Sequence, residues 1–295
     1  MFKNILGNVE IKNTLNQSII NKKETHSYMF IGTDGIGKKL IAREFAKAIL
    51  CLDEERYCNK CKSCIEFDGS NNPDFSEITS EGNHIGIEKI REMQKRVYEK
   101  PIISKRKVYI IDNADLMTDQ AQNCLLKTLE EPPEFVTIIL IGSNENNFLT
   151  TIKSRCTIIH FNDISNKEIK QYLKENHNIE ANEKTIEMCQ GSIGKAIYSK
   201  DKLEQYEKIS NVIENIETKD IIDLIEEMEI LYDAKDEIEK ILNYINVVLL
   251  KMAKTDWKYT NCIQIVENTK KRLKQNANYD MCIDNLLFKI WEEVA

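Results

Sequence analysis

Apolar and polar residues follow different patterns in the two parts of this chain. In the first part, short continuous apolar runs alternate with stretches in which apolar residues recur every three or four positions. Such runs are typical of strands buried on both faces of a sheet, and the intervening stretches are typical of amphipathic helices. The runs cover residues 28–31, 108–111 and 136–141, and the helical stretches cover residues 38–50, 87–98 and 119–129. This alternation predicts an α/β fold with a parallel sheet, over residues 1–161.

The remainder of the chain lacks residues that break helices. All four prolines lie at or before Pro133, and the last glycine is Gly194. We therefore predict an all-α C-terminal domain over residues 204–295, in which the apolar stripes form the core. A short helical piece over residues 162–203 is expected to form a small lid domain. The stripes are Ile221, Leu224, Ile225 and Met228, then Ile238, Ile241, Leu242 and Ile245, then Leu286, Leu287, Ile290 and Trp291.

Composition narrows the class of protein. The formal net charge of −7 argues against a protein that binds DNA on its own, because such proteins usually carry a basic excess. The N-terminus lacks the apolar stretch of a secretion signal, and the longest apolar runs are too short to span a bilayer. We expect a cytoplasmic protein with no membrane partner. Its nine cysteines are then reduced unless they hold a metal.

A candidate phosphate-binding loop follows the first apolar run. Gly32, Gly35, Gly37 and Lys38 fit the pattern G-x-x-x-x-G-K, between a predicted strand and a predicted helix. Glycines let backbone N–H groups converge on phosphate oxygens at a helix N-terminus. The position after Lys38 normally carries a Ser or Thr that binds Mg²⁺, but here it carries Lys39. We expect phosphate binding at this loop with impaired Mg²⁺ binding; the alternative is a chance glycine-rich turn.

A second acidic position ends the run at residues 108–111. Asp112 fits the pattern of an aspartate that orients Mg²⁺ in a P-loop protein, although an isolated Asp there could also be a turn residue. The next residue is commonly a Glu that activates the attacking water, but here it is Asn113, whose neutral amide cannot accept a proton. Lys39 and Asn113 belong to one chemical step. Their combination predicts that hydrolysis is lost and that ATP or ADP binds weakly or not at all.

Four cysteines lie close together after the helix that the loop opens. Cys51, Cys58, Cys61 and Cys64 have the spacing of a tetrahedral, structural Zn²⁺ site. Free thiols or a disulfide pair are the alternatives. The other five cysteines are isolated among apolar residues and are expected in the core; they are Cys124, Cys156, Cys189, Cys262 and Cys282.

These features together resemble the clamp-loader branch of the AAA+ proteins. The resemblance is dense from about residue 7 to residue 160, and beyond residue 200 it rests on helical character alone. It implies an AAA+ domain, a lid and a helical collar, in a subunit of an open ring that loads a sliding clamp onto primed DNA. The strings that carry it are residues 26–30, 72–74, 87–91, 112–117, 123–133 and 152–156.

Within this branch the chain is more similar to the delta-prime subunits of bacterial DNA polymerase III than to the ATP-hydrolysing tau/gamma motor subunits, which remain the alternative. Motor subunits are expected to carry Thr and Glu where this chain has Lys39 and Asn113, and a sensing arginine where it has Lys195. The resemblance implies a component of the polymerase holoenzyme without enzymatic activity of its own. Its implied partners are the tau/gamma and delta subunits, and the clamp and primer-template DNA through the assembled complex.

The resemblance also singles out Arg155, just before a predicted strand over residues 157–161. Arginines at this edge of AAA+ rings face the neighbour's nucleotide, so Arg155 is expected to act as an arginine finger in trans. The alternative is a surface arginine paired with an acid such as Asp163. Two further classes of protein stay open on the motifs alone: a P-loop metabolite kinase and a zinc-dependent nucleic-acid-binding module.

Overall fold

The computed structural model describes residues 1–2, 5–54, 56–80, 82, 84–177, 186, 191–192, 203–235, 237–275 and 277–294. The chain divides into two compact units. The first comprises Met1–Ala181 with Cys189–Ala196, and the second comprises Asn182–Met188 with Ile197–Ala295. Most of the lid expected over residues 162–203 lies outside the described residues, so its boundaries stay a prediction. Among the described helices, none is long and apolar enough to cross a bilayer.

The first unit contains a parallel sheet of five strands in the order β2-β3-β4-β1-β5. Each central strand is buried along its whole length, as the continuous apolar runs predicted. Register pairs place Met29 beside both Leu140 and Ile158. The strands are β1 (Ser27–Ile31), β2 (Phe75–Ile78), β3 (Lys107–Ile111), β4 (Val136–Gly142) and β5 (Thr157–His160).

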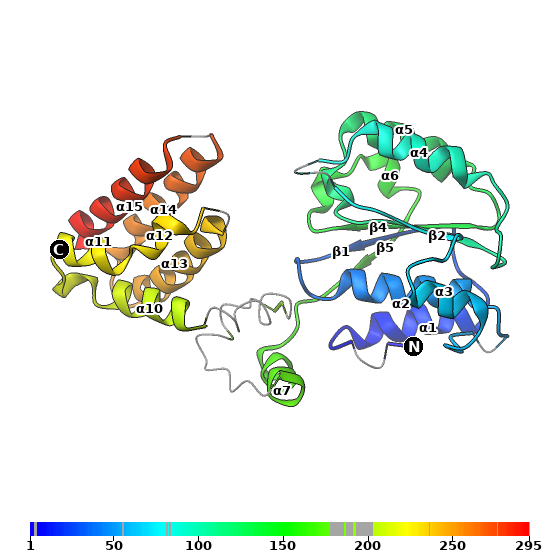
Figure 1. Cartoon of the computed structure of the whole chain (residues 1–295), viewed down its shortest axis with the longest axis horizontal. Coiled ribbons are helices and arrows are strands. Elements are labelled where there is room, and N and C mark those ends of the chain that lie inside the picture. The colour runs from blue at the N-terminus through cyan, green and yellow to red at the C-terminus, as the bar shows by residue number, and fades with distance from the viewer. Residues whose placement is uncertain are drawn as a thin grey trace. The chain divides into compact units, whose positions relative to one another are not determined.

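Helices cover both faces of this sheet (Figure 1). On one face lie α1 (Val9–Ile20), α2 (Lys38–Leu50) and α3 (Lys62–Asp68); on the other lie α4 (Ile87–Val97), α5 (Asp119–Glu130) and α6 (Thr150–Lys153). Successive strand residues point to opposite faces, so Phe30 packs with Phe45 of α2 while Met29 packs with Leu125 of α5. The unit also contains η1 (Ala114–Leu116), η2 (Glu145–Asn147) and α7 (Asn166–His177). The predicted α/β fold with a parallel sheet is confirmed.

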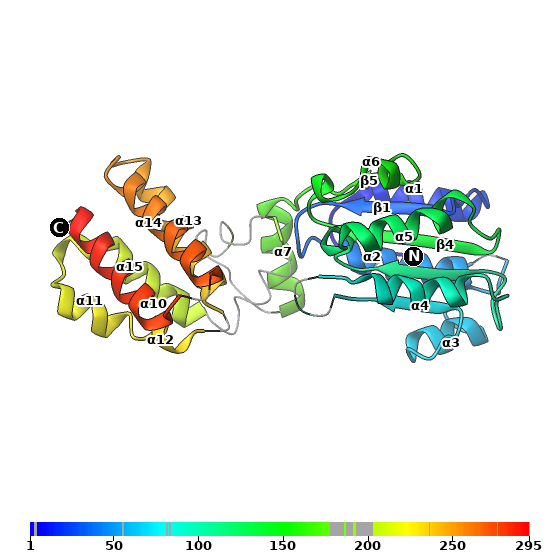
Figure 2. The same ribbon diagram turned by 90° about the horizontal axis from the view of Figure 1, so that it is seen from above.

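The described part of the second unit is entirely helical, as predicted (Figure 2). Its helices surround one apolar core, which includes Leu224, Ile241 and Leu286 from the three expected stripes. Ile225, expected beside Leu224, is instead 37% exposed. Trp291 lies at the edge of the core and donates its indole N–H to the carbonyl of Lys219 over 2.9 Å. The elements are α10 (Leu203–Glu214), η3 (Ile216–Thr218), α11 (Ile221–Glu227), α12 (Ile230–Asp233), α13 (Ile238–Ala253), α14 (Tyr259–Lys274) and α15 (Tyr279–Val294).

Candidate functional site

The glycine-rich loop joins β1 to α2 at the carboxyl edge of the sheet. A Cβ on Gly32 would lie 2.8 Å from Cδ1 of Ile36 and 2.9 Å from the carbonyl oxygen of Phe161, so a larger residue would collide with backbone. Gly37 has φ of 95° and caps the N-terminus of α2 in a conformation that favours glycine. Gly32 thus permits close packing under the loop, while Gly37 lets the chain turn into a helix whose first N–H groups attract anions.

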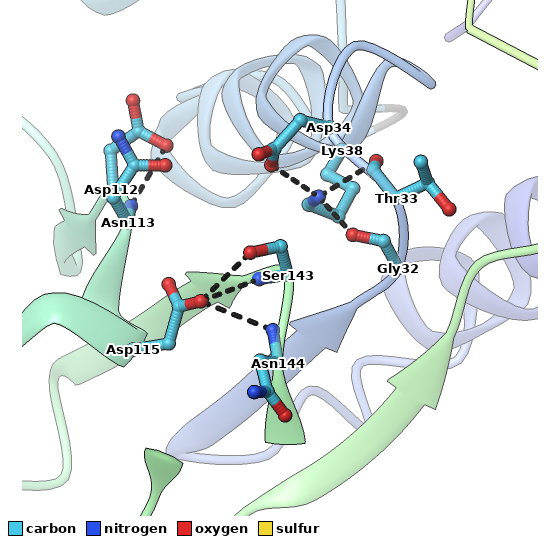
Figure 3. A network of polar contacts seen from close by, with 9 residues as sticks. All are labelled: Gly32, Thr33, Asp34, Lys38, Asp112, Asn113, Asp115, Ser143 and Asn144. Atoms are coloured by element: carbon cyan, nitrogen blue, oxygen red, sulfur yellow. Dashed lines mark hydrogen bonds and ion pairs between the residues drawn. The ribbon is translucent and has the colours of Figure 1, made fainter. Parts of the chain in front are cut away.

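Lys38 is the buried cation of this loop and is only 5% exposed. Its ammonium donates to the carbonyl oxygens of Gly32 and Thr33, the latter over 2.9 Å, and lies 3.4 Å from Oδ1 of Asp34 (Figure 3). The first two contacts fix the ammonium within the loop. The third is long, and the side chain of Asp34 is 72% exposed. A phosphate oxygen can therefore replace Asp34 without disturbing the loop.

Lys39 contacts two acidic side chains and not the loop carbonyls that Lys38 contacts. Its ammonium lies 3.0 Å from Oδ2 of Asp112, at the end of β3, and also pairs with Glu77 of β2. Arg43, one turn further along α2, pairs with the same Glu77. Partial burial alone would lower the pKa of Lys39, but hydrogen bonds to Glu77 and Asp112 outweigh it and raise that pKa. Burial would raise the pKa of Glu77, but Lys39 and Arg43 lower it, so both groups are charged at neutral pH.

P-loop hydrolases hold Mg²⁺ with a hydroxyl after the loop lysine and with a strand-end aspartate. Here the first position carries the Lys39 ammonium, which has no lone pair for a metal. The second, Asp112, already accepts a hydrogen bond from that ammonium. These residues do not fit Mg²⁺ in the usual P-loop arrangement.

The residues after Asp112 form a second polar cluster. Asn113 has a φ of 51° and an exposed side chain, and its backbone N–H donates to Oδ1 of Asp112 over 3.1 Å. Asp115 is 8% exposed and accepts hydrogen bonds from Ser143 and from the backbone N–H of Asn144 at the end of β4 (Figure 3). Ser143 and Asn144 were missed in the sequence. Their place in the sequence could have identified them, because polar residues directly after a buried parallel strand lie at the edge where ligands bind.

Arg155 lies between α6 and β5 with its side chain 33% exposed. One guanidinium nitrogen lies 2.7 Å from Oε1 of Glu130, and another donates to the carbonyl of Thr151 over 2.8 Å. The acid paired with Arg155 is therefore Glu130 and not Asp163. The carbonyl of Arg155 accepts a hydrogen bond from Ser27, at the start of β1, over 2.6 Å.

This contact places Arg155 at the amino edge of the sheet, whereas the phosphate loop begins at the carboxyl end of β1. Gly32 lies five positions after Ser27 along β1, which corresponds to about 16 Å at ~3.3 Å per residue. Arg155 and the chain's own phosphate loop are therefore at opposite edges of the sheet.

The four cysteines of the predicted metal site come together. Their Sγ atoms all lie within 4.8 Å of one another, with Cys51 3.5 Å from Cys58 and 3.9 Å from Cys61. Zn–S bonds of about 2.3 Å in a tetrahedron place sulfurs about 3.8 Å apart, so the cluster fits Zn²⁺. All four are free thiols, as are the other described cysteines, which disfavours the disulfide alternative. The cluster could bind a metal, and four thiolates leave no open position for catalysis.

Of the isolated cysteines, Cys262 and Cys282 are buried as predicted. Cys124 and Cys156 are only partly buried, because each lies at the margin of the core on the α5 face of the sheet. Cys189 and the segment containing Gly194 and Lys195 lie outside the described residues.

Comparisons with known proteins agree with this architecture. A family model described as "DNA polymerase III, delta subunit" matches residues 7–165, more than half of the chain. The tau subunit of DNA polymerase III from Bacillus subtilis is 37% identical over 172 residues, which are 57% of this chain and 30% of that protein. The delta-prime subunit of the same organism is 35% identical over 162 residues, 55% of this chain and 49% of that protein. The chain thus spans between 30% and 49% of the length of these relatives.

A solved structure shows the same fold. The gamma subunit-related protein of Thermotoga maritima superposes with a TM-score of 0.50 over 96% of this chain and 99% of that one, at 19% identity. Fold and site therefore define a P-loop protein of the AAA+ class. The chain belongs to the DNA polymerase III clamp-loader subunit family matched over residues 7–165.

Proposed function

We propose that this chain is a clamp-loader subunit of DNA polymerase III in the delta-prime role. It does not hydrolyse ATP itself and completes the ATP site of a neighbouring subunit. The observation that carries the proposal is the contact between Lys39 and Asp112. An ammonium at this position and the neutral amide of Asn113 remove both the metal ligand and the base that P-loop hydrolysis requires.

The position of Arg155 supports a role in trans. Because Arg155 and the chain's own phosphate loop are at opposite edges of the sheet, its guanidinium cannot reach its own nucleotide. It is partly exposed and held by an exposed acid, so a neighbouring subunit can approach it. A guanidinium keeps its charge and offers planar donors to a γ-phosphate.

The remaining roles follow from this assignment. Gly32, Gly35, Gly37 and Lys38 form the phosphate-binding loop, and the four-cysteine cluster holds a structural Zn²⁺. The partners are the tau/gamma and delta subunits, with the sliding clamp and primer-template DNA contacted through the assembled complex in the cytoplasm. The net charge of −7 favours DNA contact through the complex over binding by the isolated chain.

One observation favours the alternative, an ATP-hydrolysing tau/gamma subunit. Relatives of that type are as similar to the chain as the delta-prime relative, at 37% against 35% identity. Both matches cover little more than half of the chain, and identities this similar do not separate the two types. The residues that separate the types chemically are Lys39 and Asn113, and both favour the delta-prime role.

The test is the composition and activity of the native complex. We expect the chain to copurify with motor subunits at one copy per complex, and clamp loading by the reconstituted complex to require it. Several copies per complex, together with ATP turnover by the isolated chain, would instead show the motor role. Absence of other polymerase subunits from the purified material would refute both roles.

A further inference from the structure

The charges around Asp112 balance without a metal ion. Asp112 and Glu77 contribute two negative charges, and Lys39 and Arg43 contribute two positive charges through direct ion pairs. In a metal-dependent P-loop site a divalent cation supplies that positive charge. Here Lys39 and Arg43, one turn apart on α2, supply the positive charge. The departure from a Mg²⁺ site therefore involves Arg43 as well as Lys39.

We propose that this P-loop binds a nucleoside di- or triphosphate in its metal-free form, with the ammonium of Lys39 in the role that Mg²⁺ has elsewhere. The inference rests on the proposed non-hydrolysing role of the same site. In this interpretation the loop binds a nucleotide and keeps it without hydrolysing it.

The phosphate loop itself retains the features that such a ligand needs. Lys38 has three N–H donors, of which the carbonyls of Gly32 and Thr33 take two. Its third contact, to the exposed Asp34 at 3.4 Å, is the one that a phosphate oxygen displaces. Gly37 leads into α2, whose first N–H groups favour the same anion.

Lys39 is suited to the role of a fixed cation. Its side chain is 42% exposed, so a ligand can reach it, while Asp112 and Glu77 hold its ammonium in place. Its raised pKa keeps it charged at neutral pH. Mg²⁺ could bind Asp112 only after this ammonium had moved away, because the two cations repel each other and compete for the same carboxylate.

The experiment measures binding of ADP and ATP to the full-length chain by calorimetry, in MgCl₂ and in excess EDTA. We expect the apparent affinity for each nucleotide to be at least as high in EDTA as in MgCl₂, because Mg²⁺ in solution binds free nucleotide and so competes with the chain for the metal-free form. Lys39→Thr restores the hydroxyl and frees Asp112, so its affinity should fall at least about tenfold in EDTA and recover with Mg²⁺. Lys39→Met removes the charge without adding a metal ligand, so its affinity should fall in both conditions.

Mn²⁺ provides a second readout that does not depend on affinity for nucleotide alone. With nucleotide present, the paramagnetic resonance of Mn²⁺ should show no protein-bound ion for the wild type beyond the Mn²⁺–nucleotide signal of a protein-free sample, and a protein-bound ion for Lys39→Thr. Lys38→Ala, which removes the loop cation, is the loss-of-binding control. Equal thermal midpoints for wild type and the Lys39 variants show that the fold is intact.

Two outcomes overturn the inference: affinity that falls at least about tenfold when Mg²⁺ is removed from the wild type, or no binding of either nucleotide in either condition. Both are distinct from failure of the proposed function. That proposal fails if the isolated chain turns over ATP steadily, whereas metal-dependent binding without turnover overturns only the present inference.

Discussion

The guanidinium of Arg155 lies 2.7 Å from the carboxylate of Glu130 and so joins the start of β5 to the end of α5. The side chains are 33% and 49% exposed, and a pair this exposed stabilises a protein by about 1 kcal/mol or less. Glu130 therefore holds the arginine in one orientation, but only weakly. Under the proposed function, a phosphate of a neighbouring subunit would replace Glu130 after assembly.

Replacing Arg155 with Ala should leave folding and ring assembly intact and lower the DNA- and clamp-stimulated ATPase of the reconstituted complex. Arginine fingers are worth roughly 10³–10⁵ in rate in GTPases, and we expect a loss of at least about tenfold for the affected site. Arg155→Lys should recover little of this rate, because lysine lacks the planar pair of donors. Steady-state ATPase assays of the complex measure the effect.

Lys153→Ala is the matched control for that experiment. Lys153 ends α6 two residues before Arg155, and its ammonium lies 3.7 Å from Glu145 of the same unit. Its loss removes a nearby positive charge without removing the guanidinium, so ATPase should stay close to wild type. If Arg155→Ala also assembles normally with unchanged ATPase and clamp loading, Arg155 is only a surface charge.

The cysteine cluster should hold one Zn²⁺ per chain, measured by elemental analysis of the purified protein. Changing Cys58 and Cys61 together to Ser should abolish the metal, since two thiolate ligands of four are lost. Cys124→Ser is the control, because Cys124 lies outside the cluster and contacts Gln94 instead. A metal content near zero in the wild type, or metal retained by the double variant, is incompatible with the assignment.

The core of the fold could be predicted because buried parallel strands are continuous apolar runs. Residues 28–31, 108–111 and 136–141 correspond closely to β1, β3 and β4. Strand β2 was missed because its sequence, Phe-Ser-Glu-Ile, contains only two apolar residues and forms an edge of the sheet. Helix α1 was missed because it buries only Leu15 and Ile19, which is too weak a stripe to stand out.

The site was predictable only where a motif fixes the local backbone. Lys38, Lys39 and Asp112 could be identified from their places after strands. Glu77, the second acid that pairs with Lys39, could not be identified, because no local pattern shows which acid of an edge strand will face α2. The pairing of Arg155 with Glu130 was missed for the same reason: the contact joins residues from different elements.

The isolated chain should show no ATP turnover above that of its Lys38→Ala variant. Asn113 cannot accept the proton of an attacking water, and Lys39 stands where the hydroxyl that binds Mg²⁺ is needed. A coupled assay for ADP release, run with and without Mg²⁺, measures this. Steady turnover that disappears in Lys38→Ala would identify a working motor site and favour the tau/gamma alternative.

The last prediction concerns Asp74, which lies directly before β2 and is only 2% exposed. Its carboxylate accepts three backbone hydrogen bonds of 2.7 Å, from Ile102, Ile103 and Ser104. Asn72, two residues earlier, extends this network, because its side-chain amide donates to the carbonyl oxygen of Ser63 in α3, the helix that contains Cys64. Asp74 therefore joins the cysteine cluster, β2 and the segment that leads into β3.

Asp74→Asn keeps the shape but replaces one acceptor oxygen with a donor, so at least one buried N–H loses its partner. A hydrogen bond to a charged group contributes about 1.5–3 kcal/mol, and a buried donor left unsatisfied costs about 1–3 kcal/mol. We therefore expect the α/β unit to lose about 3 kcal/mol of unfolding free energy. Circular dichroism during urea unfolding should show an earlier transition. Both tryptophans, Trp257 and Trp291, lie in the helical unit, so their fluorescence should report an unchanged transition there.

The control variant Asp119→Asn makes the same charge change at an exposed position of α5 and should cost at most about 1 kcal/mol. Equal, small shifts for the two variants would show that the Asp74 network does not stabilise the fold.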